Sequence, residues 1–140
     1  QRSRRRASFR AQIGMVFAGS AVTTMINEFG ATAVVFTGVA GGLKKEQEVG
    51  ELVVGEDVVN YEMDARSFCP PWDADYKYQL GEIPIMKWRF YEADAAMLAL
   101  AMEAPVDAGV RRTKGRLASG SIFLDVDDLV EIGALETYVL

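Results

Sequence analysis

Apolar positions in the first part of the chain indicate a helix followed by a buried strand. Residues 13–28, IGMVFAGSAVTTMINE, carry apolar side chains on most helical faces. This pattern predicts a helix over about 15–27 that is buried on much of its surface and ends at Gly30. Residues 33–36, AVVF, are too apolar to have a solvent-facing side, so they predict a fully buried strand.

The rest of the chain alternates between strand and helix patterns. Extended, β-branched sequence predicts strands over 51–54 and 57–61, with Gly55 as a bulge or turn between them. Strong helix formers, acids in the first turn and a following proline predict a helix over 92–104, and residues 110–118 predict another strand. Helices that alternate with buried strands indicate a layered α/β domain.

Residues 62–88 interrupt this alternation. Their prolines prevent a regular helix, and a long irregular segment in a compact domain is usually functional or disordered. Three aromatic residues, Phe68, Trp72 and Tyr76, favour a packed loop or an interface here. After the last strand we expect one more short helix, over 128–132.

Composition and charge restrict the domain organisation and the partners. A chain of 140 residues, 50% of them hydrophobic, suits a single domain with its own core and contains no apolar run long enough to span a bilayer. The net charge is −5 although five of the 15 basic residues lie in the first ten positions, and such an acidic body argues against nucleic-acid binding. We expect residues 1–10 to be a solvated, disordered basic segment, and 11–140 to be the domain. The Arg-rich start is also compatible with a remnant of an organellar transit peptide.

The missing residue types restrict the chemistry. The chain has no histidine and a single cysteine, Cys69. Ser-His-Asp and Cys-His catalysis and the usual zinc sites are therefore excluded, and so is an intrachain disulfide framework. A lone cysteine indicates a reducing, cytoplasmic compartment. Carboxylates, backbone amides, hydroxyls and lysine remain as the reactive groups.

The glycine-rich segment at 38–42 has three possible uses: a nucleotide phosphate, a small substrate or a tight turn. The dinucleotide fingerprint requires G-x-G-x-x-G at the start of a helix, whereas here G-x-x-G-G leads into charged residues and then a strand. The phosphate-loop pattern G-x-x-x-x-G-K-[ST] is not matched either. A dinucleotide-dependent oxidoreductase is thus the weakest alternative, and the substrate and turn readings stay open.

Six short blocks, in order along the chain, resemble the nucleoside phosphorylase and nucleosidase superfamily. They are I-G-M-V-F-A at 13–18, T-G-V-A-G-G-L at 37–43, V-G-E-L-V-V at 49–54, the strand and loop at 61–68, G-E-I-P at 81–84 and S-G-S-I-F-L at 119–124. The resemblance implies a three-layer α/β/α fold with a mixed central sheet. It is strongest to the methylthioadenosine/S-adenosylhomocysteine nucleosidases, which hydrolyse purine-nucleoside N-glycosidic bonds in nucleoside salvage and need no metal or organic cofactor.

One position bears on the nucleophile. Phosphorylases that this chain resembles carry an arginine two positions before the first glycine, where it helps to neutralise the attacking phosphate. Phe36 occupies that position here and cannot neutralise an anion. The resemblance therefore implies water as the nucleophile, and a nucleoside phosphorylase is kept as the second alternative.

The resemblance also implies a set of substrate-binding residues. The backbone at Val39, Ala40 and Gly41 would line the nucleoside pocket, with Ala40 and Gly41 against the purine, where a large side chain would block the base. Phe123 would pack on the purine face, and the backbone at Leu124 would read the purine edge.

Two further residues complete the implied site. Ile13 would lie near the sugar and the attacking water. Phe68 matches a residue that reaches into the pocket of a partner subunit, which implies a homodimer that binds a purine nucleoside.

The catalytic carboxylates of the family have no counterpart in this chain. The acid that activates water would precede residue 1, and the Met-Glu pair and the late aspartate would follow residue 140. Ser121 also replaces the aspartate of the family's S-G-D block. We therefore expect a partial domain without its first strand and C-terminal part, with no catalytic residue of its own and little or no turnover. The alternative is a non-catalytic purine-binding, storage-like or interaction protein of the same fold.

Overall fold

The computed structural model describes residues 7–44, 46–122 and 124. The chain divides into two compact units, Gln1–Val39 and Ala40–Leu140. The predicted division into a basic segment over 1–10 and a domain over 11–140 stays a prediction. The short helix expected over 128–132 lies outside the described residues.

The first unit contains helix α1, Met15–Phe29. Gly30 ends it in the left-handed conformation, with φ 63°, and donates its N–H to the carbonyl of Ile26 at 3.1 Å. The predicted helix and its terminator are thus confirmed. The predicted burial is not, because Ala21 is the one buried residue of α1 and Val16 is 80% exposed.

The prediction of a buried strand over residues 33–36 was wrong. These residues form no strand, and Val35 and Phe36 are 72% and 78% exposed. A buried strand needs paired neighbours, and the described residues of the first unit contain a helix and no strand. The apolar, β-branched residues of this run are typical of a strand, but the structure does not form one there.

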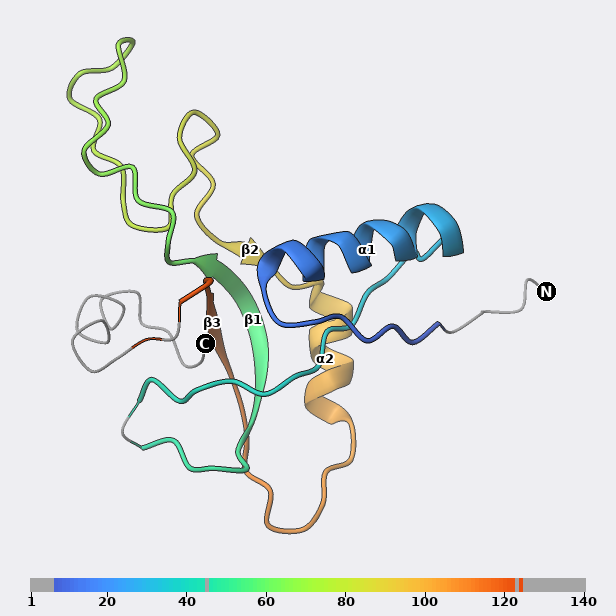
Figure 1. Ribbon diagram of the computed structural model, residues 1–140. Coiled ribbons are helices and arrows are strands. Elements are labelled where there is room, and N and C mark those ends of the chain that lie inside the picture. The colour runs from blue at the N-terminus through green and yellow to red at the C-terminus, as the bar shows by residue number, and fades with distance from the viewer. Residues whose placement is uncertain (1–6, 45, 123, 125–140) are drawn as a thin grey trace. The chain divides into compact units, whose positions relative to one another are not determined.

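The second unit is built on a mixed sheet (Figure 1). Its strands are β1, Leu52–Asn60, β2, Tyr91–Glu92, and β3, Arg112–Ser119, in the order β2-β1-β3. Strand β1 runs parallel to β3 and antiparallel to β2. Helix α2, Ala95–Glu103, connects β2 to β3 and contacts β1. The predicted mixed sheet and the strand over 110–118 are confirmed.

A β-bulge interrupts the pairing of β1 beside Gly55. Gly55 pairs with Gly115 and Asp57 pairs with Arg116, so Glu56 is the extra residue on β1. The two strands predicted over 51–54 and 57–61 are therefore one continuous strand with a bulge, which was one of the two alternatives for Gly55.

Helix α2 begins later than the pattern predicted. Tyr91 and Glu92 pair with Val58 and Asp57 of β1, so they belong to the sheet. Asp94 is the N-cap, and its carboxylate accepts a hydrogen bond from the N–H of Met97 at 2.9 Å. At the other end, the Arg112 guanidinium donates to carbonyls of the last turn, those of Ala101, Met102 and Ala104.

Candidate functional site

Three buried residues form a core where the two parallel strands end. Val59, Tyr61 and Ala118, called here the sheet-end cluster, are at most 6% exposed. Val59 and Ala118 lie near the carboxyl ends of β1 and β3, and Tyr61 directly follows β1. Ligands of open α/β sheets bind beyond the carboxyl ends of the strands, so this end of the sheet is the candidate site.

The glycine-rich segment is attached to the sheet-end cluster. Leu43, next to the glycines, packs against the cluster. The following turn is closed by Gln47, whose side-chain Oε1 accepts from the N–H of Lys44 at 2.9 Å and whose own N–H donates to the carbonyl of Lys44 at 3.1 Å. Ala40 and Gly41, both exposed, are thus held within three residues of a fixed anchor.

The segment that follows β3 reaches the same cluster. Leu124 packs against it, as Leu43 does. The structure therefore brings together two of the predicted elements of the purine pocket, the segment with Ala40 and Gly41 and the segment with Leu124. Their roles toward a purine stay predictions.

The G-E-I-P block also contacts the sheet-end cluster. Gly81 has φ +85°, and a Cβ built there would lie 2.5 Å from Cγ2 of Val59. Both the positive φ and the close approach require glycine. The N–H of Gly81 donates to the carbonyl of Met63 at 2.7 Å, which ties the G-E-I-P block to the start of the irregular region.

The remaining predicted pocket residues lie outside the described part of the second unit. Ile13 and Val39 belong to the first unit and are 87% and 103% exposed, and Phe123 lies outside the described residues. Their assignments stay predictions.

Phe68 lies in an aromatic cluster within residues 62–88. Its ring centroid is 6.5 Å from that of Trp72 and 5.9 Å from that of Tyr78, and Tyr78 in turn is 4.9 Å from Tyr76. The prediction of a packed loop is confirmed. Phe68 is still 43% exposed, and its contact with a partner subunit stays a prediction.

Tyr76 and Glu82 form a polar pair at the edge of this aromatic cluster. The Tyr76 hydroxyl donates to Oε1 of Glu82 at 2.5 Å, and the N–H of Gln79 donates to Oε2 at 3.0 Å. The hydrogen bond to Glu82 is the main reason that the pKa of Tyr76 is raised to about 12. Tyr76 is therefore a neutral hydrogen-bond donor at neutral pH. Apart from the presence of Glu82 in the G-E-I-P block, nothing in the sequence indicated this pair.

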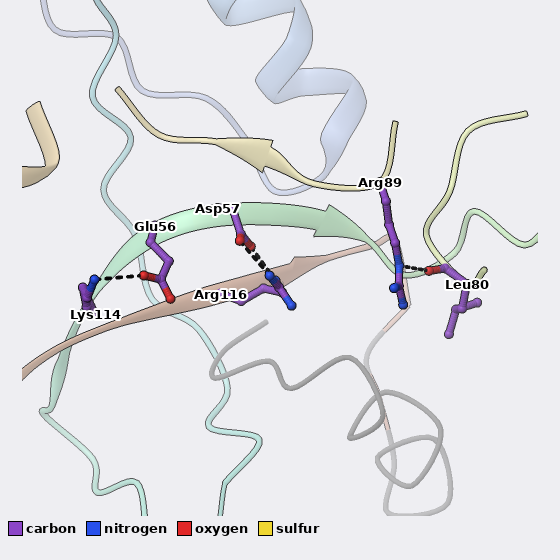
Figure 2. Close-up of polar contacts among 6 residues, drawn as sticks. All are labelled: Glu56, Asp57, Leu80, Arg89, Lys114 and Arg116. Atoms are coloured by element: carbon purple, nitrogen blue, oxygen red, sulfur yellow. Dashed lines mark hydrogen bonds and ion pairs between the residues drawn. The ribbon is translucent and has the colours of Figure 1, made fainter. Parts of the chain in front are cut away.

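Ion pairs hold several carboxylates of the sheet. Figure 2 shows Asp57 and Arg116 pointing toward each other from β1 and β3, with Nε and Oδ1 2.6 Å apart, and Glu56 and Lys114 paired at 3.3 Å. Phe90 lies against the Arg116 guanidinium, with its ring centroid 3.6 Å from Cζ. These carboxylates stabilise pairing between strands, and sequence reasoning did not identify them because their partners lie nearly 60 positions away.

Asp64 makes a similar but local pair. Its carboxylate accepts two side-chain hydrogen bonds from Arg66, at 2.9 and 2.7 Å, and a third from the Arg66 N–H at 3.0 Å. The side-chain hydrogen bond to Arg66 is the main reason that the pKa of Asp64 falls to about 2. Such a carboxylate is a poor general base. In the part of the chain that the structure describes, no group of three or more metal-ligating side chains is found.

The elements of the second unit define an α/β protein with a mixed sheet. The candidate site lies at the carboxyl ends of its two parallel strands, where ligands of open α/β sheets bind. The family model of the phosphorylase superfamily matches residues 3–127. The chain therefore belongs to the phosphorylase superfamily, as its six sequence blocks predicted.

The chain is similar to named nucleosidases. It is 34% identical over 119 residues to 5′-methylthioadenosine/S-adenosylhomocysteine nucleosidase of Halalkalibacterium halodurans, a match that covers 85% of this chain and 48% of the relative. It is 31% identical over 114 residues to aminodeoxyfutalosine nucleosidase of Campylobacter jejuni, covering 81% of this chain and 46% of the relative. The chain thus spans about half the length of the curated relatives it matches.

Solved structures have the same fold. A futalosine hydrolase mutant of Helicobacter pylori matches with a TM-score of 0.78 at 28% identity, covering 92% of this chain and 56% of that one. The 5′-methylthioadenosine/S-adenosylhomocysteine nucleosidase of Neisseria meningitidis in complex with methylthio-immucillin-A matches with a TM-score of 0.74 at 27% identity, covering 92% and 54%. These similarities confirm the predicted α/β class. Among the described residues, no helix is long and apolar enough to cross a membrane.

Proposed function

We propose that the chain forms part of the nucleoside pocket of an enzyme that hydrolyses the N-glycosidic bond of purine nucleosides. The observation that carries the proposal is the shared anchoring of Leu43 and Leu124 on the sheet-end cluster, at the carboxyl ends of β1 and β3. Two relatives are named as nucleosidases of different substrates, and both names support the same reaction class.

The proposed pocket uses backbone more than side chains. Ala40 and Gly41 form a wall against the purine, and the backbone of Leu124 hydrogen-bonds the purine edge. The backbone at Val39 belongs to the same proposed lining, and Ile13 is assigned to the sugar and the attacking water. Bare backbone suits a flat purine because a side chain at these positions would occupy the space of the base.

Phe123 and Phe68 are assigned to the two ends of the substrate. Phe123 packs on the purine face. Phe68 covers the 5′ substituent in the pocket of a second copy, so the active form is a homodimer. The 43% exposure of Phe68 supports this assignment, since an aromatic residue left partly uncovered by its own loop has surface available for a partner.

In the proposed reaction, water adds to C1′ of the ribose and the purine leaves with a proton. Phe36 offers no charge for phosphate, which favours hydrolysis over phosphorolysis. The carboxylates of Asp57, Glu56 and Asp64 are engaged by cations, so they are unsuited to moving protons. Because the catalytic acids implied by the resemblance have no counterpart among these 140 residues, we expect little or no turnover by them alone. We expect hydrolysis where further sequence supplies the acids, without metal or organic cofactor.

A hydrolysis assay tests this proposal. The 140-residue chain and the longest natural form of the protein are each incubated with methylthioadenosine, adenosylhomocysteine and inosine, with and without phosphate, and the products are separated by chromatography. The proposal expects the longer form to release free purine and free sugar at a rate that does not depend on phosphate. A sugar 1-phosphate product would instead favour the phosphorylase alternative.

The second candidate is a purine-binding protein without catalysis. The ion pairs of the sheet favour this candidate, because carboxylates that are paired with cations between strands stabilise the fold and do not transfer protons. The two candidates differ in one result. Purine binding by the longest natural form, without release of purine from any nucleoside, would establish binding alone.

A further inference from the structure

Tyr61 ties together the ends of the two parallel strands. Its backbone N–H donates to the carbonyl of Ser119, the last residue of β3, at 3.2 Å. Its hydroxyl donates to the carbonyl of Ile122, three residues further along, at 2.8 Å. Tyr61 is 6% exposed and Ile122 is 61% exposed, so this partly buried hydrogen bond links the core to a surface residue. One residue thus contacts both ends of the turn that follows β3.

The glycine between these two carbonyls makes room for the Tyr61 ring. A Cβ built on Gly120 would lie 2.2 Å from Cζ and 2.5 Å from the hydroxyl oxygen of Tyr61. The other close atom, Cε1, would be 2.4 Å away. The tyrosine ring occupies the space that a side chain at position 120 would need, which explains why glycine is found there.

The segment held in this way leads directly to Leu124. Leu124 follows Ile122 by two residues, and its side chain packs against the cluster that contains Tyr61. The Tyr61 hydroxyl therefore holds the backbone at Ile122, and the cluster to which Tyr61 belongs contacts Leu124. Both contacts lie within two residues of the backbone that is assigned to the purine edge.

We propose that Tyr61 is a positioning residue for purine recognition, which sets where the backbone of Leu124 lies by hydrogen-bonding Ile122 and filling the space beside Gly120. This inference rests on the proposed function. A recognition backbone works only while its amide and carbonyl stay within hydrogen-bond distance of the base, so a loosened segment loses purine affinity even though no group that touches the purine is removed.

The test compares two buried tyrosines in the longest natural form of the chain. Tyr61→Phe keeps the ring and removes the hydroxyl. We expect adenine to bind about threefold to tenfold more weakly by calorimetry, the range that corresponds to one lost hydrogen bond. Tyr78→Phe is the matched control. Tyr78 is 3% exposed and its hydroxyl accepts from the N–H of Ile85 at 3.1 Å, so it loses a comparable bond within residues 62–88.

The control separates positioning from general loosening. Tyr78→Phe is expected to lower the melting temperature as Tyr61→Phe does, yet to bind adenine like the wild type. In Tyr61→Phe alone, amide hydrogen exchange at Leu124 is expected to be faster. Equal loss of adenine affinity in both variants would overturn the inference, because the effect would then be one of stability.

Two further outcomes are distinct. If the wild type binds adenine and Tyr61→Phe binds it equally well, Tyr61 does not position the segment and the proposed function stands. If the wild type binds neither adenine nor a purine nucleoside, the proposed function is overturned and this inference with it. Should Gly120→Ala fold, it is expected to weaken adenine binding as well, through displacement of the same ring.

Discussion

Single residues near the carboxyl ends of β1 and β3 determine where the flanking segments lie. Tyr61 holds the turn after β3, and Gly81 brings the G-E-I-P block against Val59. Leu43 anchors the glycine-rich segment beside them. Residues with no direct part in chemistry thus determine whether the proposed pocket exists, and substitutions at these positions have measurable consequences.

At Gly120 we expect a substitution to alanine to destabilise the chain. The new methyl group would lie 2.2 Å from Cζ of Tyr61, and overpacking of this kind costs roughly 1–3 kcal/mol. Gly19→Ala in α1 is the control, since nothing lies within 4 Å of its Cβ position and alanine favours a helix by about 1 kcal/mol. Urea unfolding measures both. A wild-type midpoint for Gly120→Ala would contradict the packing described here.

The ion pair of Asp64 gives a prediction about pH. Because Arg66 lowers the folded-state pKa from 3.8 to about 2, the pair stabilises the fold above pH 3.8, and that contribution disappears as the pH falls toward 2. Arg66→Ala is expected to return the pKa of Asp64 toward 3.8. Carboxyl-carbon NMR titration measures it directly, with Arg111→Ala, which removes a partner of Glu51, as control. An Asp64 pKa near 3.8 in the wild type would refute the pairing.

At the level of elements, the sequence predicts what depends on local pattern. It predicted α1 and its end at Gly30 and the strand that became β3, and the bulge beside Gly55 was one of the two alternatives it left open. Residues 33–36 failed because a strand is defined by its neighbours, and hydrophobicity alone does not supply them. Residue 92 was placed in a helix because an acid is typical of a first turn, although it pairs with Asp57 in the sheet.

In the candidate site, too, the sequence predicts the local motifs and does not predict the contacts between distant residues. The glycine-rich segment and the block around Leu124 could be found from sequence because each is a contiguous motif. The pairs Tyr61–Ile122 and Asp57–Arg116 could not, since their members are 61 and 59 positions apart and nothing in either local sequence specifies the partner. Only the paired register of β1 and β3 brings them together.

The N-cap of α2 is a testable element-level feature. Asp94→Ala removes the acceptor for the N–H of Met97, which is expected to cost about 1 kcal/mol of stability. Asp107→Ala is the control, because the group of Asp107 that accepts from the N–H of Val110 is its backbone carbonyl, which alanine keeps. Circular dichroism during urea unfolding measures both midpoints. Equal midpoints for the two variants would show that Asp94 does not cap the helix.

At the scale of the whole molecule, the chain belongs to the phosphorylase superfamily and spans about half the length of its curated relatives. It also exposes large apolar side chains, among them Ile13 at 87%, Val16 at 80%, Phe36 at 78% and Val39 at 103%. Soluble monomers seldom leave such surface uncovered. The apolar surface of the 140 residues therefore favours association with other polypeptide.

We expect the isolated 140-residue chain to self-associate. Light scattering coupled to size exclusion should give a mass above the 15.4 kDa of one chain, increasing with concentration. Val39→Ser and Phe36→Ser are expected to reduce the association, whereas Lys77→Ser, at an already polar position, serves as control. A monomer at all concentrations would contradict this account of the exposed apolar residues.

Calorimetric titration with adenine and methylthioadenosine tests the central claim, that the segments beside the sheet-end cluster form a purine site. The account predicts saturable binding to the wild type, strong weakening in Gly41→Val, where a branched side chain would occupy the space of the base, and unchanged binding in Gly19→Val, whose Cβ position in α1 is open. Absence of binding to the wild type, or equal binding by Gly41→Val and the wild type, would contradict it.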